Sequence, residues 1–443
     1  MSSIIRSTSN FFTNVVHRFL PDPLIFAILL TVLVFGLGLG ITPKTTSQMV
    51  MIWGNGFWNL LAFSMQMALV LVTGHALASS GPVKSAMKSM ASVANTPAQG
   101  VMLVTVVAAV ASTINWGFGL VLGAMFAREV ARRIPKSDYS LLIACAYIGF
   151  LTWHGGLSGS IPLIAATPGN PMEKTVGLIP VTETLWTGYN IFITVALIVT
   201  LPFLTRMMMK PESEVVPVDP ALLKEEESFQ RELGPDSSIA ERMEESRTLA
   251  IVVAAAIFAY LGLRFAEKGV KIDINTVNMM FVGAGILLHK TPMAYARAIT
   301  AAARGTAGIM IQFPFYAGIQ LMMEHSGLGG IITNWFVDIA TKDTFPLLAF
   351  LSSGLINFAV PSGGGHWVVQ GPFVMPAAQA LGADLGKSAM AIAYGEAWMN
   401  MAQPFWALPA LAIAGLGVRD IMGYCVTALL FSGFIFVGGL YLF

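Results

Sequence analysis

The sequence predicts an all-α polytopic membrane protein, and three observations support that fold class. Hydrophobic residues fill 55% of the 443 positions and charged residues only 11%, whereas soluble domains carry about 25% charged residues. Sixteen charged residues fall within one stretch, 210–247, so the rest of the chain is poorer still in charge. Apolar runs long enough to cross a bilayer recur throughout. The formal net charge of +1 excludes a basic nucleic-acid-binding protein.

The first segment, residues 1–23, has one apolar helical face and one polar face, which is typical of a helix lying at the membrane surface. With the N-terminus in the cytoplasm, 18 of the 25 Lys and Arg residues fall on the cytoplasmic side, as the positive-inside rule requires. About nine transmembrane helices are expected, at residues 24–41, 57–79, 140–168, 185–209, 248–265, 275–289, 304–324, 388–417 and 421–443.

Two further apolar segments, 98–131 and 345–384, do not fit as single crossings. Basic residues on both sides of 98–131 favour the cytoplasm, and one crossing needs about 20 residues, so the segment is too short to cross twice. We expect re-entrant helical hairpins, with tips at residues 115–119 and 357–366. Two spans, 140–168 and 388–417, are also interrupted by helix-breaking residues and are expected to be broken helices.

The two halves of the chain form a repeat. Gln66 and Ser80-Gly81 recur as Gln312 and Ser326-Gly327 at an offset of 246, and the breaks recur at nearly the same offset. The charge map places the halves in opposite orientations, as in secondary transporters with a site near the midplane. The predicted organisation is a first repeat (24–209), a charged cytoplasmic linker (210–247), a connecting helix (248–265) and a second, inverted repeat (266–443).

The tips and breaks contain no Lys or Arg, which suits one small carboxylate better than a multiply charged anion. Substrate is expected to bind the polar side chains and the glycine backbone there; helix packing is the alternative role of the glycines. These candidate residues are Asn115, Gly117, Gly119, Thr152, His154, Ser158, Ser160, Asn357, Ser362, Gly363, Gly364, Gly365, His366, Asn400 and Gln403.

Four tryptophans flank the same tips and breaks and are expected to wall a half-apolar pocket, with core packing as the alternative: Trp116, Trp153, Trp367 and Trp398. Glu396 lies within an apolar run, where a carboxylate is costly unless it is paired, hydrated or protonated. It is the candidate coupling residue, with a structural hydrogen bond as its alternative role. The coupling ion is left open between H⁺ and Na⁺, the latter near Asn115 and Asn357. No firm metal site and no cofactor are expected.

Several runs resemble the bacterial short-chain fatty acid transporter family over essentially the whole chain, among them Ile114-Asn115-Trp116-Gly117-Phe118-Gly119 and Asn357-Phe358-Ala359-Val360-Pro361-Ser362-Gly363-Gly364-Gly365-His366-Trp367. The resemblance implies uptake of small monocarboxylates such as acetoacetate and butyrate across the bacterial inner membrane. It also implies kinship with a broad ion-transporter superfamily, whose dimeric members use paired hairpins and an elevator-like shift, so a homodimer in the lipid bilayer is expected.

The function predicted from both arguments is secondary active transport of a small monocarboxylate with a cation, by alternating access. A C4-dicarboxylate carrier is the nearest alternative. A gated anion channel would need a continuous pore lined with charge or carbonyl rings. An enzyme is disfavoured because the sequence has no zinc-protease, serine-hydrolase or nucleotide-binding motif, and Cys145 and Cys425 form no metal spacing.

Overall fold

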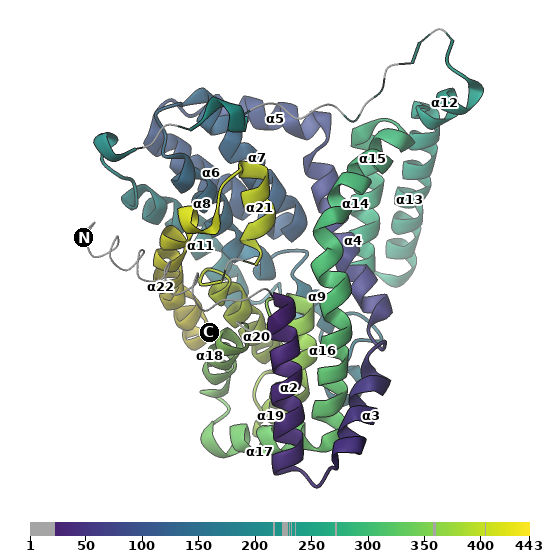
Figure 1. The fold of residues 1–443 in the computed structure, drawn as a ribbon, viewed down its shortest axis with the longest axis vertical. Helices are drawn as coiled ribbons and strands as arrows, with labels where there is room; N and C mark the ends of the chain where they lie inside the picture. Colours follow the sequence, from purple (N-terminus) through teal and green to yellow (C-terminus); the bar gives the residue numbers. More distant parts are fainter. Residues whose placement is uncertain are drawn as a thin grey trace.

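Helices form the regular secondary structure throughout the part of the chain that the computed structural model describes, residues 23–443 except 216–217, 224–228, 230, 232, 235, 271–272, 358–359 and 404. The predicted all-α class is confirmed (Figure 1). The amphipathic segment expected at residues 1–23 lies almost entirely outside the described residues.

The first half of the chain places a helical hairpin and a broken helix between longer helices. Asn115 ends one arm of the hairpin and N-caps the other, because its side-chain Oδ1 accepts a hydrogen bond from the N–H of Phe118 at 2.9 Å. The elements in order are α2 (Pro23–Ile41), α3 (Thr46–Gly56), α4 (Leu61–Ala78), α5 (Gly81–Ala91), the hairpin α6 (Pro97–Ile114) and α7 (Trp116–Arg133), the broken helix α8 (Tyr139–Gly149), η1 (Phe150–Gly155) and α9 (Ser160–Ala165), then the short turns α10 (Glu173–Val176) and η2 (Val181–Glu183), and α11 (Gly188–Met207).

The second half repeats this order after one additional helix, α13 (Arg247–Lys268). Its elements are α14 (Ile274–His289), α15 (Pro292–Ala303), η5 (Arg304–Thr306), α16 (Ala307–Ser326), α17 (Leu328–Ile339), the hairpin α18 (Phe345–Asn357) and α19 (Gly363–Leu381), the broken helix α20 (Leu385–Met399) and α21 (Ala407–Ala414), and α22 (Val418–Leu442).

Equivalent helices begin at equivalent residues. Thr45 N-caps α3 and Thr291 N-caps α15, 246 positions later. Asp138 N-caps α8 and Asp384 N-caps α20 at the same offset, and each carboxylate accepts from the backbone N–H three residues on. A cap oxygen satisfies an otherwise unpaired N–H and fixes where a helix starts. The repeat is therefore also present in the residues at which equivalent helices begin.

The first two helices of each half pack on a helix of the other half. The pair α2 and α3 packs on α16 of the second half, and the pair α14 and α15 packs on α4 of the first. Equivalent elements also lie at opposite ends of the molecule: α5 at the upper end in Figure 1, and α17 at the lower. This arrangement is the one expected of repeats related by an axis in the membrane plane.

Within the described residues, five helical stretches are long and apolar enough to cross a membrane: Pro97–Ile114, Tyr139–Ala165, Gly188–Met207, Ile239–Glu267 and Val418–Leu442. Shorter apolar helices, such as Ile274–His289 and Phe345–Asn357, lie beside these stretches in the sequence. The first stretch, α6, packs along its partner α7 in the hairpin. The chain is thus a multi-pass membrane protein.

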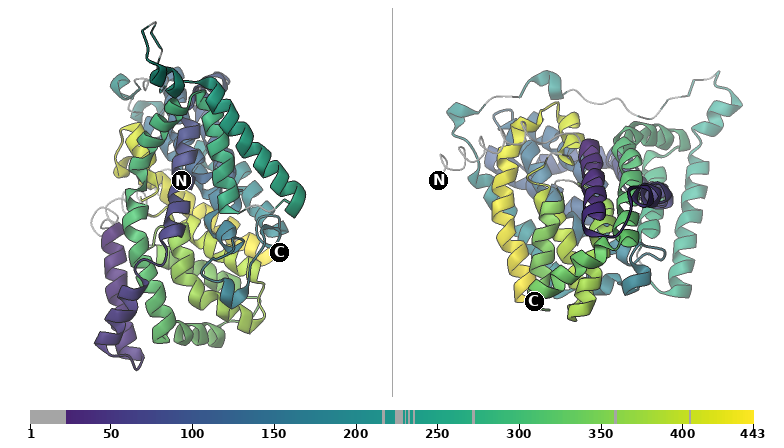
Figure 2. Two further views of the ribbon diagram at one scale, coloured as in Figure 1. Left: turned by 90° about the vertical axis from the view of Figure 1, so that its right-hand side faces the viewer. Right: turned by 60° about the horizontal axis from the view of Figure 1, so that its bottom comes forward.

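The described parts of the linker lie at the end of the molecule where α5 and α15 are found (Figures 1 and 2). Its described part contains only short helices, namely η3 (Glu212–Glu214), η4 (Pro220–Leu223) and α12 (Ile239–Glu244). At its start, the Lys210 ammonium lies 3.1 Å from the Asp138 carboxylate. The linker therefore begins against the N-terminus of the first broken helix.

Candidate functional site

The two broken helices meet at a buried pair of ionisable side chains. His154 comes from η1, in the first break, and Glu396 lies near the end of α20, just before the second. Nε2 of His154 is 3.0 Å from Oε2 of Glu396, and both side chains are completely buried. The two residues are 242 positions apart, so this contact joins the two repeats. A histidine and a carboxylate in contact can hold a proton on either partner.

Amide side chains complete the surroundings of Glu396. Nδ2 of Asn400 donates to both carboxylate oxygens, each at 3.2 Å. Nδ2 of Asn357, at the end of α18, donates to Oδ1 of Asn400 and to the backbone carbonyl of Glu396, both at 2.9 Å. Gln403 donates to the same Asn400 oxygen at 2.7 Å. These bonds fasten the second hairpin to the second broken helix and hold the Asn400 amide that contacts the carboxylate.

The first hairpin is fastened to the first break by its backbone. The N–H of Trp116 donates to Oγ of Ser158 at 2.8 Å, and Oγ1 of Thr152 donates to the carbonyl of Ala109 at 2.7 Å. The N–H of Leu157 donates to the carbonyl of Thr113 at 2.6 Å. Thr152 and Ser158 were expected to bind substrate. In the structure their hydroxyls hold the first hairpin against the first break.

Close packing also accounts for two glycines of the first tip. A Cβ at Gly117 would lie 2.9 Å from the Cα of Leu71 in α4, and one at Gly119 would overlap Ser112 of α6. Only glycine allows backbones to approach this closely. Close packing of α7 on α4 and α6 therefore requires glycine at both positions.

The second tip reaches the first break. A Cβ at Gly363 would lie 2.8 Å from Cε1 of His154 and 2.8 Å from the ring of Trp153, and one at Gly365 would lie 2.6 Å from Tyr316. Ser362 N-caps α19 by accepting from the N–H of Gly365 at 3.3 Å, and Gly364 is buried beside it. Residues from both halves therefore converge on His154.

His366 is placed differently from His154. Its Nε2 lies 2.9 Å from Oγ of Ser353 and 2.6 Å from Oε1 of Gln370. Both partners belong to the second hairpin, so His366 ties α18 to α19. Ser353 in turn donates to the carbonyl of Ile392 in α20 at 2.6 Å.

Three buried indoles gather where the first tip and the two breaks meet. The ring centroids of Trp116 and Trp406 are 5.1 Å apart, those of Trp116 and Trp153 5.8 Å, and those of Trp153 and Trp406 6.4 Å. Phe150 stacks on Trp153 at 5.1 Å. Trp406, from the second break, was not among the residues expected at the site.

Trp398 does not belong to this group, contrary to the expectation that it walls the same pocket. Its Nε1 donates to the carbonyl of Leu429 in α22 at 2.7 Å, and its ring lies 5.1 Å from that of Phe350. The turn of α20 directs this side chain toward α18 and α22. Trp367 is completely buried in α19.

Unpaired hydrogen-bonding groups are concentrated around these tips and breaks. Most buried polar groups in proteins have a partner, so each exception calls for an explanation. Among the described residues, Oδ1 of Asn357 is the one unpaired group there that can only accept a hydrogen bond. The other unpaired groups donate or are able to donate: Nδ2 of Asn115, Nε1 of Trp116, Trp153, Trp367 and Trp406, Nδ1 of His154 and Oγ of Ser160.

The asparagines at the two tips differ in whether their side-chain oxygen has a hydrogen-bond partner. Oδ1 of Asn115 is engaged in capping α7. Within the described part of the chain, His, Cys, Asp and Glu residues form no group of three placed to hold a metal ion. Oδ1 of Asn357 is buried without a hydrogen-bond partner among the described residues.

Residues 4–443 match the model of the family described as short chain fatty acid transporter. The chain belongs to that family. A relative in Escherichia coli (strain K12) is 71% identical over 440 residues, which cover 99% of this chain and 100% of the relative. A relative in Haemophilus influenzae is 61% identical over 445 residues, with the same coverage, and both are named for short-chain fatty acid transport.

Solved structures of two transporters share the fold of this family member. The YdaH transporter of Alcanivorax borkumensis superposes with a TM-score of 0.57 at 17% identity, covering 94% of this chain and 98% of that one. MtrF of Neisseria gonorrhoeae, from a class described as antimetabolite efflux pumps, gives 0.55 at 15% identity, covering 97% and 96%. At these identities the likeness extends to the fold alone.

Proposed function

We propose that this chain carries short-chain monocarboxylates, such as butyrate and acetoacetate, across the bacterial inner membrane by proton symport with alternating access. The observation that carries the proposal is the excess of unpaired buried donors beside the indoles of Trp116, Trp153 and Trp406. A carboxylate accepts hydrogen bonds and supplies none, and its short apolar tail suits aromatic walls.

The charge of the site supports one carboxylate rather than two. The tips and breaks hold no Lys or Arg, and donors without a full positive charge stabilise a single anion better than a dianion. Family membership points the same way, since both relatives are named for short-chain fatty acids.

Electrostatics supports the proton as the coupling ion. Glu396 is completely buried, so an ionised glutamate and a substrate anion would repel each other in a medium of low dielectric constant. A proton held by the His154–Glu396 pair removes that repulsion. Nδ2 of Asn400 already donates to both carboxylate oxygens, and Nε2 of His154 lies 3.0 Å from one of them. These contacts leave the oxygens poorly suited to Na⁺, an ion that takes oxygen ligands.

Uptake of labelled butyrate by the purified protein in sealed liposomes tests the substrate class. We expect saturable uptake that unlabelled acetoacetate inhibits and succinate does not. Inhibition by succinate at equal concentration would favour a C4-dicarboxylate carrier, and uptake that never saturates would favour a channel; either result contradicts the proposal.

A further inference from the structure

Two tyrosines at equivalent positions of the repeat are buried beside the breaks. Tyr147 lies in α8 and Tyr394 lies in α20, 247 positions later. The two residues are 0% and 1% exposed, and a tyrosine hydroxyl this far from water needs a hydrogen-bond partner. Neither residue was among those expected at the site.

The hydroxyl of Tyr147 binds the start of the second break. It donates to the backbone carbonyl of Asn400 at 2.9 Å. In a continuous helix that carbonyl would accept from the N–H four residues on, but residue 404 is a proline, which has no N–H. Asn400 is the C-cap of α20, and its side chain donates to both carboxylate oxygens of Glu396. Tyr147 therefore supplies a donor at the residue that contacts this carboxylate.

Tyr394 acts on the first break through one intermediate residue. Its hydroxyl donates to Oδ1 of Asn190 in α11 at 2.7 Å, and Nδ2 of Asn190 donates to the carbonyl of Gly155 at 3.0 Å. Gly155 directly follows His154 and is the last residue of η1. The N–H four residues further on donates elsewhere, to the carbonyl of Gly156. Asn190 therefore binds a carbonyl that the break leaves without its helical donor.

These hydrogen bonds cross between the repeats. A tyrosine of the first repeat holds the backbone beside Glu396, and a tyrosine of the second repeat holds the backbone beside His154. The two side chains that are held in this way contact each other, with Nε2 and Oε2 at 3.0 Å. Because a hydrogen bond weakens steeply when its geometry is poor, movement of either break alters the contact through which the pair shares a proton.

We propose that Tyr147 and Tyr394 are positioning residues for the proton-holding pair of His154 and Glu396. Each hydroxyl acts through a neighbour, Asn400 for the first and Asn190 for the second. The role of the two hydroxyls is to keep the pair at the separation at which a proton moves together with substrate. This inference rests on the proposed function, because it concerns the coupling of protons to butyrate.

The number of protons that enter with each butyrate tests this role. Proton entry into liposomes is followed with an enclosed pH-sensitive dye and butyrate entry with a radioactive label, and both are corrected for liposomes without protein. The ratio does not depend on how much of the protein is folded, so a merely structural role would leave it unchanged. In Tyr147→Phe and in Tyr394→Phe it should fall at least about twofold, the smallest equilibrium factor that loss of one neutral hydrogen bond produces.

Tyr139→Phe is the matched control in the same helix. The hydroxyl of Tyr139 donates to the carbonyl of Ala414, at the end of α21, at 3.0 Å. The control therefore loses the same kind of buried bond about two helical turns from Tyr147. Its ratio of protons to butyrate should equal that of the unmodified protein.

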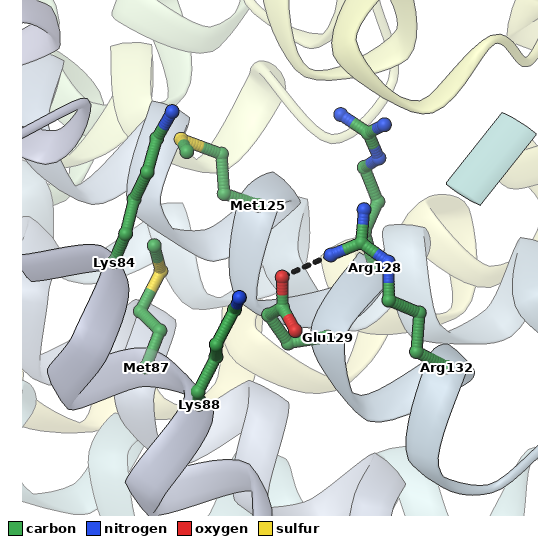
Figure 3. A pocket seen from close by; sticks show the side chains of 7 residues that line it. All are labelled: Lys84, Met87, Lys88, Met125, Arg128, Glu129 and Arg132. Carbon is green, nitrogen blue, oxygen red and sulfur yellow. Dashed lines mark hydrogen bonds and ion pairs between the residues drawn. The ribbon is translucent and has the colours of Figure 1, made fainter. Parts of the chain in front are cut away.

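Glu129→Gln is the control for a carboxylate outside the pair. Glu129 is paired with Arg132 in a pocket between α5 and α7 (Figure 3). It is 13 positions after Trp116 in α7, which places it about 20 Å along the helix from the first tip. Loss of this carboxylate should leave the ratio unchanged.

Asn190→Leu gives a third measurement, because it removes the residue through which Tyr394 acts; its ratio should fall at least as far as that of Tyr394→Phe. Elution from a sizing column shows which variants are folded. Ratios in the Tyr147, Tyr394 and Asn190 variants equal to that of Tyr139→Phe would overturn the inference, as would an equal fall in all the variants and controls. Butyrate entry without protons in the unmodified protein would instead overturn the proposed function, and the inference with it.

Discussion

Gly363 of the second hairpin lies against His154 of the first break, so that a Cβ added at residue 363 would fall 2.8 Å from Cε1 of the imidazole. Such a separation is shorter than carbon atoms tolerate, and the helical backbone on one side and the buried ring on the other leave little room for adjustment. The second tip can occupy this position only because residue 363 has no side chain.

Gly363→Ala should therefore displace the tip from His154 and lower the rate of butyrate uptake at least about tenfold, as misplacement at an active centre does. Gly330→Ala is the matched control, because Gly330 is also helical and a Cβ there meets nothing within 4 Å. Uptake in liposomes checks both variants. Equal uptake by the two would show that the close approach at Gly363 has no part in transport.

Asn115 combines a capping oxygen with an unpaired amide donor, and two substitutions separate these roles. Asn115→Ser keeps an oxygen able to cap α7 but removes the amide N–H, so the KM for butyrate should rise roughly 10- to 150-fold with little change in thermal stability. Asn115→Ala should add a loss of about 1 kcal/mol in stability. If Asn115→Ser transports with an unchanged KM, the tip does not bind substrate.

Trp406 and Trp398 are buried to different extents and differ in whether the indole N–H has a partner. Trp406→Phe removes an unpaired donor, so it should raise the KM for butyrate while the melting temperature changes little. Trp398→Phe breaks the bond to Leu429, so it should cost about 1 kcal/mol of stability and leave KM unchanged. Kinetics and thermal melting of both variants are compared; the reverse pattern would remove Trp406 from the site.

The orientation of the repeats can be tested by labelling. Lys88, Lys136 and Lys342 are all exposed, and α5 lies at the opposite end of the molecule from α17 (Figure 1). Cysteines at Lys88 and Lys136 should react with an impermeant maleimide only from the cytoplasm, and a cysteine at Lys342 only from outside. Reaction at Lys88 and Lys136 from opposite faces would turn the first hairpin into a single crossing and contradict inversion.

Composition and helix-breaking residues were enough to predict the all-helical class, because apolar length and interrupted runs are local properties. The helices α3, α5, α15 and α17 were not predicted, since each is only 11 or 12 residues long and falls below the length that marks a crossing. Two of them, α3 and α15, are capped by Thr45 and Thr291, a residue type that favours helix starts.

Pairing between distant side chains could not be predicted in the same way. Glu396 and His154 were each singled out, yet nothing in local sequence specifies that residues 242 positions apart meet. Trp398 and Trp406 show the same limit. Trp398 lies in the last turn of α20 and Trp406 directly before α21, and only the packing of these two helices decides which indole faces the first tip. Thr152 and Ser158 were expected to bind substrate because they are polar. Their hydroxyls form hydrogen bonds that dock the first hairpin, a role that polarity alone does not reveal.

Substrate accumulation driven by a proton gradient tests the central claim most directly. Liposomes containing the unmodified protein or Glu396→Gln are given an inward proton gradient, or separately an inward Na⁺ gradient, and labelled butyrate is followed over time. We expect the unmodified protein to concentrate butyrate on the proton gradient alone, and Glu396→Gln, which mimics the protonated side chain, to exchange butyrate without concentrating it. Accumulation driven only by Na⁺, or undiminished proton-driven accumulation by Glu396→Gln, would contradict the account.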